Sequence, residues 1–337
     1  NYALENERGD ILDGTNISGQ RGSLVWGVKR RLADSSSIYA EQRHQDANEA
    51  RGLTHAAGLS LNLGDRWSLG ANAELGTLQD SETAAETERR AGGVRVSYIL
   101  GSTRISSGVE YRADDSERPD ATHVERTTWL FRNNFKVQMS DDWRLVGKFD
   151  HSMSESSQGQ FYDGRFTEGV IGFGYRPVLS NRLNALAKYT YFYNVPTTDQ
   201  VTLTGTAAQF IQKSHIGSVD ANYALTPWWS VGGKYAYRLG SVSLDRENPE
   251  FFDNRAQLVI LRTDVRLFQV WEGLLEARRL HLPDLDESRG GMLLGVYRYF
   301  GEHVKAGVGY NFTDFSENLT DLSYRHQGLF LNVVGAL

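Results

Sequence analysis

The sequence predicts an all-β protein, a single antiparallel transmembrane β-barrel of about eighteen strands, with about sixteen as the alternative count. Three observations predict this fold class. Apolar and polar residues alternate along most of the chain, short connections alternate with longer polar ones, and five of the seven tryptophans follow a short connection. No apolar run approaches the ~18–20 residues that a transmembrane helix needs. Glycine is abundant at 34 and proline scarce at 6, which favours strands joined by tight turns.

The alternation gives each predicted strand two distinct faces. In segment 66–75, Trp67, Leu69 and Leu75 share one face, whereas Ser68 and Asn72 share the other. The same period of two recurs in segments 182–194 and 303–312. Each segment has about the ~9–11 residues of a tilted membrane-spanning strand, so we expect the apolar face to contact lipid and the polar face to line a lumen. A soluble sandwich or propeller would also alternate, but it has no reason to separate short and long connections so regularly.

The connections between these strands fall into two classes. The short ones lie at residues 31–35, 63–66, 100–103, 140–142, 178–181, 225–227, 268–269 and 301–302. Longer and more polar ones lie between them, for example at 79–88, 113–121, 245–253 and 315–323. Outer-membrane barrels have short periplasmic turns and longer extracellular loops. Counting hairpins gives about seventeen strands from Gly22 onward, and an even total needs one more, in segment 2–10, so that both termini are periplasmic. The whole chain, 1–337, is then one outer-membrane barrel domain, in which residues 1–21 give the weakest strand signal and a loop.

The tryptophans provide a separate indication of the same plan. The tryptophans that lie just after a short connection are Trp67, Trp143, Trp228, Trp229 and Trp271. Their shared level in the predicted barrel is what an aromatic girdle at the membrane interface requires. The alternative is that these tryptophans belong to the core of a soluble β-fold.

The predicted inner faces carry more basic than acidic residues. The basic residues that we expect to line the pore are Arg132, Lys136, Arg144, Lys148, Lys188, Lys234, Arg262, Arg266, Arg298 and Lys305. The surplus of acids falls in the long loops, and a basic lumen favours the passage of anions. The alternative is that these charges pair across strands and only stabilise the wall, as the charges in 262–266 could with those in 272–278.

The sequence offers little for catalysis or for metal binding. It contains no cysteine, which excludes zinc–thiolate sites, disulfides and cysteine nucleophiles. It also lacks a nucleotide-binding glycine loop, an HExxH and a GxSxG motif, and its acids at 284–287 lack the spacing of a calcium loop. We therefore predict no cofactor, no metal site and no enzymatic activity. A barrel hydrolase is the alternative from another class; it needs a serine or threonine beside a histidine, with His303 and His326 the first to inspect.

The last hundred or so residues resemble a known type of barrel. The segments "RTDVRLFQVWEGLLEARRL" (262–280) and "GGMLLGVYRYFGEHVKAGVGYNFTDFSENLTDL" (290–322) and the closing strand are similar to the C-terminal outer-membrane β-barrel domains of large repeat-containing Gram-negative surface proteins. The resemblance implies a membrane anchor, or a translocation domain or pore, for a larger surface protein or polymer. A general porin-like channel with a mild anion preference is the alternative function.

The fold class also implies a location and partners. We expect a multi-pass barrel in the cell outer membrane of a Gram-negative bacterium, in contact with outer-membrane lipid and lipopolysaccharide. The segment "GLFLNVVGAL" (328–337) resembles the C-terminal signal read by the barrel-assembly machinery, although that signal favours an aromatic last residue and this chain ends on Leu337. Because a barrel has no free edge, the last strand should pair with the first. Upstream domains of the same polypeptide or a translocated polymer are further expected partners, whereas a net charge of −6 does not indicate nucleic acid.

Overall fold

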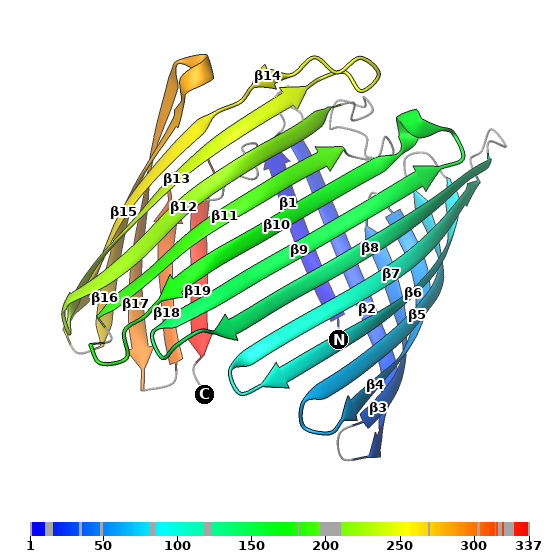
Figure 1. Ribbon diagram of the computed structural model, residues 1–337, viewed down its shortest axis with the longest axis horizontal. Helices are drawn as coiled ribbons and strands as arrows, with labels where there is room; N and C mark the ends of the chain where they lie inside the picture. Colours follow the sequence, from blue (N-terminus) through cyan, green and yellow to red (C-terminus); the bar gives the residue numbers. More distant parts are fainter. Residues whose placement is uncertain are drawn as a thin grey trace.

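The protein folds as one curved antiparallel sheet (Figure 1). The computed structural model describes residues 2–10, 16–33, 36–47, 50–80, 85–117, 123–180, 182–195, 210–268, 270–301, 304–313, 315, 319 and 327–335. Within these residues, eighteen long strands follow one another as a meander, each paired with the next along the chain. The predicted fold class and strand number are therefore confirmed.

The bounds of the elements follow the predicted hairpins. The strands are β1 (Tyr2–Asp10), β2 (Asn16–Ala33), β3 (Ser36–Ala47), β4 (Ala50–Leu63), β5 (Trp67–Asp80), β6 (Glu86–Leu100), β7 (Thr103–Glu117), β8 (His123–Gln138), β9 (Trp143–Ser156), β10 (Gly164–Tyr175), β11 (Leu183–Val195), β12 (Ile211–Thr226), β13 (Trp229–Ser243), the short β14 (Phe252–Asp253), β15 (Ala256–Leu267), β16 (Trp271–Leu282), β17 (Glu287–Phe300), β18 (Val304–Asn311) and β19 (Gly328–Gly335). Two single-turn helices, η1 (Gln160–Tyr162) and η2 (Pro283–Leu285), lie in connections. In the part of the chain that is described, neither helix has the length and apolar character that a bilayer crossing requires.

Most strands are longer than the predicted span. β7 has 15 residues and continues to Glu117, so most of the segment predicted as a loop at 113–121 is paired with β6 and β8. Half of the segment predicted as a loop at 79–88 also belongs to strands, since β5 continues to Asp80 and β6 begins at Glu86. The reason is that ladder hydrogen bonds do not depend on lipid, so pairing continues past the ~9–11 residues that cross the bilayer.

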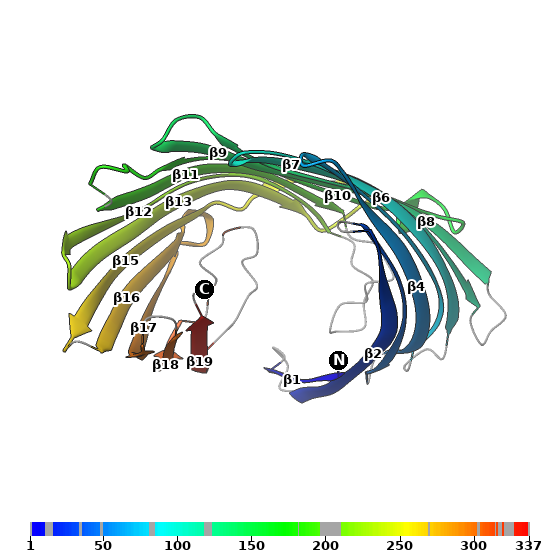
Figure 2. The same cartoon turned by 90° about the horizontal axis from the view of Figure 1, so that it is seen from below.

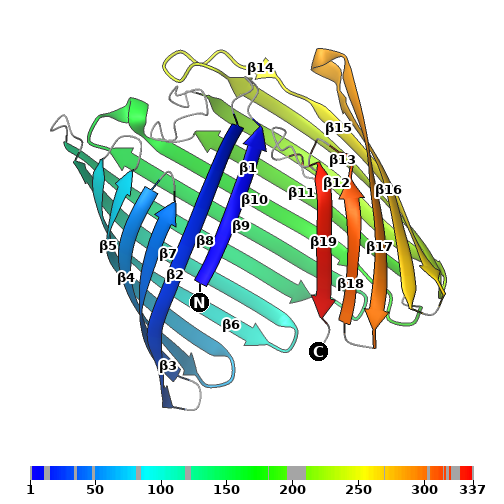
Figure 3. The same ribbon diagram turned by 180° about the vertical axis from the view of Figure 1, so that it is seen from behind.

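The sheet curls around a central space, with its first and last strands facing each other (Figures 2 and 3). The start of β1 and the end of β19 lie at the same end of the sheet as the short turns (Figure 3). Among the described residues, β1 pairs with β2 and β19 pairs with β18. Pairing between the first and last strands therefore stays a prediction.

Register separates the residues of every strand into two faces. On the outer face, large apolar side chains are exposed: Val94 is 46% exposed, Ile105 43% and Phe149 47%. An exposed apolar belt of this size is the mark of a lipid-facing surface. The opposite, inner face carries the alternate residues, most of which are polar or charged.

One part of the inner face is apolar and covered. Ile216, Ala236, Ala256, Leu258, Ile260 and Leu280, all on inner positions of β12, β13, β15 and β16, form a buried cluster with Phe315 and Leu319. Phe315 and Leu319 belong to the connection between β18 and β19 and are 3% and 1% exposed. The buried Arg238 donates a hydrogen bond from Nη1 to the carbonyl oxygen of Leu319 at 2.9 Å. The fold therefore has its apolar core inside the curve of the sheet, against one wall.

Candidate functional site on the inner wall

Most of the basic residues predicted to line a pore lie on the inner face. Arg132 and Lys136 of β8 share a face with Arg144 and Lys148 of β9, since Arg132 is paired with Asp150 and Lys136 with Val146. By the same continuity of register, the other inner-face residues of the predicted set are Lys188, Lys234, Arg262, Arg266 and Lys305. That they line an open pore stays a prediction.

Arg298 is an exception, and its predicted inward position is wrong. It is paired with Trp271, on the outer face of β17, and its guanidinium carbon lies 5.4 Å from the Trp271 ring and 5.2 Å from the Phe300 ring. Its neighbours Tyr297 and Tyr299 occupy the inner positions, Tyr297 facing Gly307 and Tyr299 facing Lys305. A long cationic side chain can lie along aromatic rings at a membrane interface, because its stem is apolar and its charge is attracted to the ring faces.

The inner faces of β6 to β9 form the most basic part of the wall. In the described residues, their inner positions carry nine basic side chains and three acidic ones. The basic residues are Arg89, Arg95, Arg104, Arg112, Arg126, Arg132, Lys136, Arg144 and Lys148, and the acidic ones are Glu110, Asp114 and Asp150. The half of this wall next to the loops differs in its contacts from the half next to the short turns.

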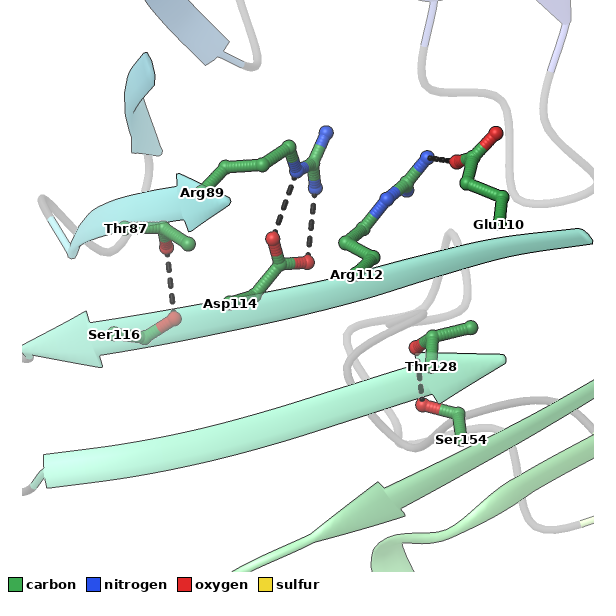
Figure 4. A network of polar contacts seen from close by, with 8 residues as sticks. All are labelled: Thr87, Arg89, Glu110, Arg112, Asp114, Ser116, Thr128 and Ser154. Atoms are coloured by element: carbon green, nitrogen blue, oxygen red, sulfur yellow. Dashed lines mark hydrogen bonds and ion pairs between the residues drawn. The ribbon is translucent and has the colours of Figure 1, made fainter. Parts of the chain in front are cut away.

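In the half next to the loops, charges and hydroxyls are paired (Figure 4). Arg89 donates to Asp114 through Nε at 2.8 Å and Nη2 at 3.0 Å, and Arg112 pairs with Glu110 at 3.1 Å. Hydroxyl pairs continue the pattern, with Thr87–Ser116 at 2.8 Å and Thr128–Ser154 at 3.0 Å. These contacts join β6 to β7 and β8 to β9 on the inner face and help to hold the two pairs of strands in register.

Lys148 is also part of a balanced group. Its Nζ lies 3.0 Å from Asp150 and 2.7 Å from Glu168, so one lysine joins acids of β9 and β10. Lys148 therefore neutralises its neighbours and adds little to the field of the lumen.

In the half next to the short turns, the basic residues of β6 to β8 stand without acids. Within the described part of the chain, no carboxylate lies within ion-pair distance of Arg95, Arg104, Arg132 or Lys136. Arg104 is directly opposite Lys136 in the ladder, which places two like charges side by side. Sequence alternation places each of these residues on the inner face, but only the register shows that two of them are opposed.

The wall formed by β12 to β18 pairs its charges differently from the prediction. Arg262 is opposite Glu276 in register, but it reaches across Gly232 of β13 to form its ion pair with Asp220 of β12. A Cβ at Gly232 would lie 2.9 Å from Cγ and Nε of Arg262, so only glycine leaves room for this path. Glu276 instead pairs with Arg278 on its own strand. The expected direct network between 262–266 and 272–278 is thus replaced by pairs that extend to other strands or run along one strand.

The last pair on this wall lies near the short turns. The carboxylate of Glu272 accepts hydrogen bonds from Lys305 of β18 and from the hydroxyl of Tyr299 of β17. Lys305 also lies 4.5 Å from the ring of Tyr297. Glu272 therefore connects β16 to both β17 and β18.

The predicted girdle residues all lie beside short turns. Trp67, Trp143, Trp229 and Trp271 begin β5, β9, β13 and β16, Trp228 precedes β13, and all five are between 38% and 54% exposed. Sequence reasoning missed two rings beside them: Tyr98 lies 4.6 Å from Trp67, and Tyr175 lies 4.7 Å from Trp143. Contact of this band with the membrane interface stays a prediction.

Two hydroxyl–imidazole pairs bear on the hydrolase alternative. Nδ1 of His151 lies 2.8 Å from Oγ1 of Thr167, and Nδ1 of His281 lies 3.0 Å from Oγ of Ser288, both on the outer face. In the described residues neither imidazole has a hydrogen bond to a carboxylate, so each pair holds two of the three groups of a triad. His303 and His326 lie outside the described residues. The absence of enzymatic activity stays a prediction.

In the loop at 283–286, Asp284 is engaged in an ion pair with Arg255. Asp284 accepts hydrogen bonds from the backbone N–H of Arg255 at 2.6 Å and from its Nε at 2.8 Å, which lowers the pKa of the carboxyl group below its ordinary value. The same contact raises the pKa of Arg255. Across the residues that the structure describes, no group of three histidine or acidic side chains could hold a metal ion.

This clamp should respond to acid. Because the pKa of Asp284 is lowered in the folded protein, its contribution to stability is present above the ordinary aspartate range and is lost as the pH falls through the lowered pKa. We expect the Arg255 amide to lose protection from hydrogen exchange over that range. The variant Arg255→Gln should lose it at a higher pH, since the charge that lowers the pKa is gone. Protection that persists unchanged to about pH 2 would contradict this assignment.

Comparisons with known proteins identify solved structures with a similar fold. No family model matches the sequence, and no curated protein matches it. Among solved structures, the copper transporter OprC is similar over 98% of this chain and 67% of its own, with a TM-score of 0.60 and 9% identity. The ferric-catecholate import receptor Fiu of E. coli K12 matches over 99% and 68%, with a TM-score of 0.56 and 9% identity. The FrpB iron transporter of Neisseria meningitidis matches over 98% and 68%, with a TM-score of 0.56 and 10% identity.

At these identities the likeness concerns the fold. The chain spans about two thirds of the length of these transporters, and for the alcaligin receptor FauA of Bordetella pertussis 62%. Together with the exposed apolar belt, the likeness confirms the predicted location: the chain is an outer-membrane β-barrel whose sheet is similar to the barrels of TonB-dependent receptors.

Proposed function

We propose that this barrel is a conduit across the outer membrane that favours anions. The supporting observation is the inner face of β6 to β9, where nine basic residues outnumber three acids. Their fields add along one wall, because the strands are consecutive. The residues on the facing wall pair with one another and cancel more of their charge.

The opposition of Arg104 and Lys136 supports a functional origin for this charge. Like charges directly opposite each other in a ladder destabilise a sheet, whereas opposite charges at such positions contribute roughly 0.2–1 kcal/mol of stability. A wall that only anchors the protein would gain stability from an acid at one of the two positions. A wall that attracts anions would retain both cations.

A second candidate is the anchor or translocation domain of a larger surface protein or polymer. It is supported by the packing of Phe315 and Leu319 against the inner wall of β12 to β16, which fills part of the space inside the curve. The similarity of the last hundred or so residues to barrels of that type favours it as well. Conductance in planar bilayers separates the two: a steady pore supports the conduit, and a silent barrel supports the anchor.

The conduit predicts a measurable anion preference. In asymmetric KCl, the reversal potential of the wild-type pore should have the sign of chloride permeation, and the preference should weaken toward ~1 M salt, where the Debye length is only ~3 Å. The double variant Arg104→Gln, Lys136→Gln should shift the reversal potential toward zero, since it removes two uncompensated charges from the lumen.

A matched control changes the same charge outside the lumen. Arg279→Gln with Arg298→Gln removes two positive charges from the outer face of β16 and β17 and should leave the reversal potential unchanged. A pore that conducts but shifts equally in both double variants, or in neither, would contradict the assignment of selectivity to the inner wall.

A further inference from the structure

We infer that the inner face of β6 to β8 near the short turns is a binding site for multivalent oxyanions, made by the basic tetrad Arg95, Arg104, Arg132 and Lys136. The inference deepens the proposed function, on which it rests for the route by which a ligand reaches the wall. It adds a discrete site and a class of ligand to a general preference for anions.

Nine adjacent inner positions on three neighbouring strands define this site. In three consecutive rows of the ladder they hold Arg95, Gly108 and Arg132; Ser97, Ser106 and Asn134; and Ile99, Arg104 and Lys136. None of the nine is an acid. The four basic residues occupy the first and third of these rows, and the second row is uncharged and hydrophilic.

The middle row gives the tetrad a floor of neutral donors. Ser97 donates a hydrogen bond to Ser106 at 3.0 Å, and Asn134 follows on β8. The rows above and below lie about 7 Å away, given the ~3.4 Å rise of each residue in an antiparallel strand. Arginine and lysine side chains are long enough to lean over such a floor, so their charged groups can converge on a ligand resting there.

Gly108 leaves space in the row that holds Arg95 and Arg132. It lies between Arg95 and Arg132 in the ladder, and a Cβ built on it would be 3.7 Å from Nε of Arg95. The side chain of Arg95 therefore extends over the glycine toward β8. A larger residue at this position would stand between Arg95 and Arg132 in the ladder.

The nearest inner-face acids have other partners. Asp150 is opposite Arg132 but pairs with Lys148 at 3.0 Å, and Glu110, two residues along β7 from Gly108, pairs with Arg112 at 3.1 Å. Arg95, Arg104, Arg132 and Lys136 are all exposed. Four exposed cations with no acid in contact within the described part of the chain are available to an external anion.

The hydrogen-bond donors of this site indicate which class of ligand it would bind. Guanidinium groups bind carboxylate and phosphate oxygens in a bidentate manner, and hydroxyl and amide groups add neutral hydrogen bonds. A cluster of four positive charges spread over two rows fits a ligand with two or more negative groups better than chloride. Phosphorylated and carboxylated solutes or polymers share this chemistry.

Isothermal titration of the detergent-solubilised barrel tests the site with two probes, inorganic pyrophosphate and tricarballylate. We expect saturable binding of at least one probe at low salt and weaker binding as salt rises. Arg104→Gln with Lys136→Gln, and separately Arg95→Gln with Arg132→Gln, should each weaken binding by about tenfold or more, as expected for the loss of hydrogen bonds to charged groups. Preference for one probe identifies the phosphate or the carboxylate source.

The outer-face double variant, Arg279→Gln with Arg298→Gln, serves as the control for net charge and should bind as the wild type does. Circular dichroism and heat-modifiable migration establish that each variant is folded. Binding that is absent for both probes, or that weakens equally in the control, would overturn the site. Because titration needs no current, a barrel that binds but does not conduct would contradict only the conduit, and one that conducts but does not bind would contradict only the site.

Discussion

Glu276→Gln should lower the free energy of unfolding by about 1.5–3 kcal/mol, the contribution of a buried hydrogen bond between charged groups. The side chains of Glu276 and Arg278 are 7% and 10% exposed, so water cannot replace the lost carboxylate. Arg262, opposite Glu276 in the ladder, adds a second positive charge nearby. The measurement is urea unfolding of the barrel refolded in lipid vesicles, followed by tryptophan fluorescence.

A pair with the same spacing and the opposite burial is the control. Glu88 and Arg90 also lie two residues apart on one strand, at 3.3 Å, but their side chains are 64% and 72% exposed. Glu88→Gln should change the free energy of unfolding by less than about 1 kcal/mol, since solvent screens an exposed pair. Equal effects of the two substitutions would show that burial does not decide the contribution of these pairs.

Leu319→Ala should destabilise the barrel by about 2–5 kcal/mol, as expected when a buried leucine is truncated in a packed core. Leu319 is 1% exposed and belongs to the cluster on the inner wall, where its carbonyl oxygen also accepts the hydrogen bond from Arg238. The substitution removes side-chain contacts and keeps that carbonyl. The loss should therefore be measurable without removing the hydrogen bond to the buried arginine.

Leu285→Ala provides the matched comparison, because Leu285 also lies in a connection but is 71% exposed. Its truncation should change the free energy of unfolding by no more than about 0.5 kcal/mol. A similar value for Leu319→Ala would mean that Phe315 and Leu319 do not pack on the inner wall in the membrane. The same unfolding assay measures both variants.

Much of the barrel follows from the sequence because a strand repeats every two residues. Alternation in 66–75 is enough to assign Trp67 and Leu75 to one face, and a short turn with Gly64 at a φ of 70° fixes where β5 begins. Strand existence, the two faces and the position of the tryptophans are local properties. They need no knowledge of the neighbouring strand.

The same rule failed where both faces are apolar or aromatic. In the segment "VYRYF" (296–300), large side chains occupy successive positions on both faces of the strand. Alternation there does not show which residues point inward. Only pairing with Trp271 assigned Arg298 to the outer face, where its stem and charge lie against aromatic rings.

The sequence alone determined the sheet, the approximate strand number and an inner face that is richer in bases than in acids. The tertiary structure decided which of those bases are neutralised. It paired Lys148 with two acids and led Arg262 across Gly232 to Asp220, but it left the tetrad of β6 to β8 without carboxylates in the described residues. It also placed Phe315 and Leu319 against the inner wall. The physical reason is that electrostatic and apolar contacts depend on distances between strands, and those are set by register and by the curvature of the sheet, neither of which appears in the period of a single strand.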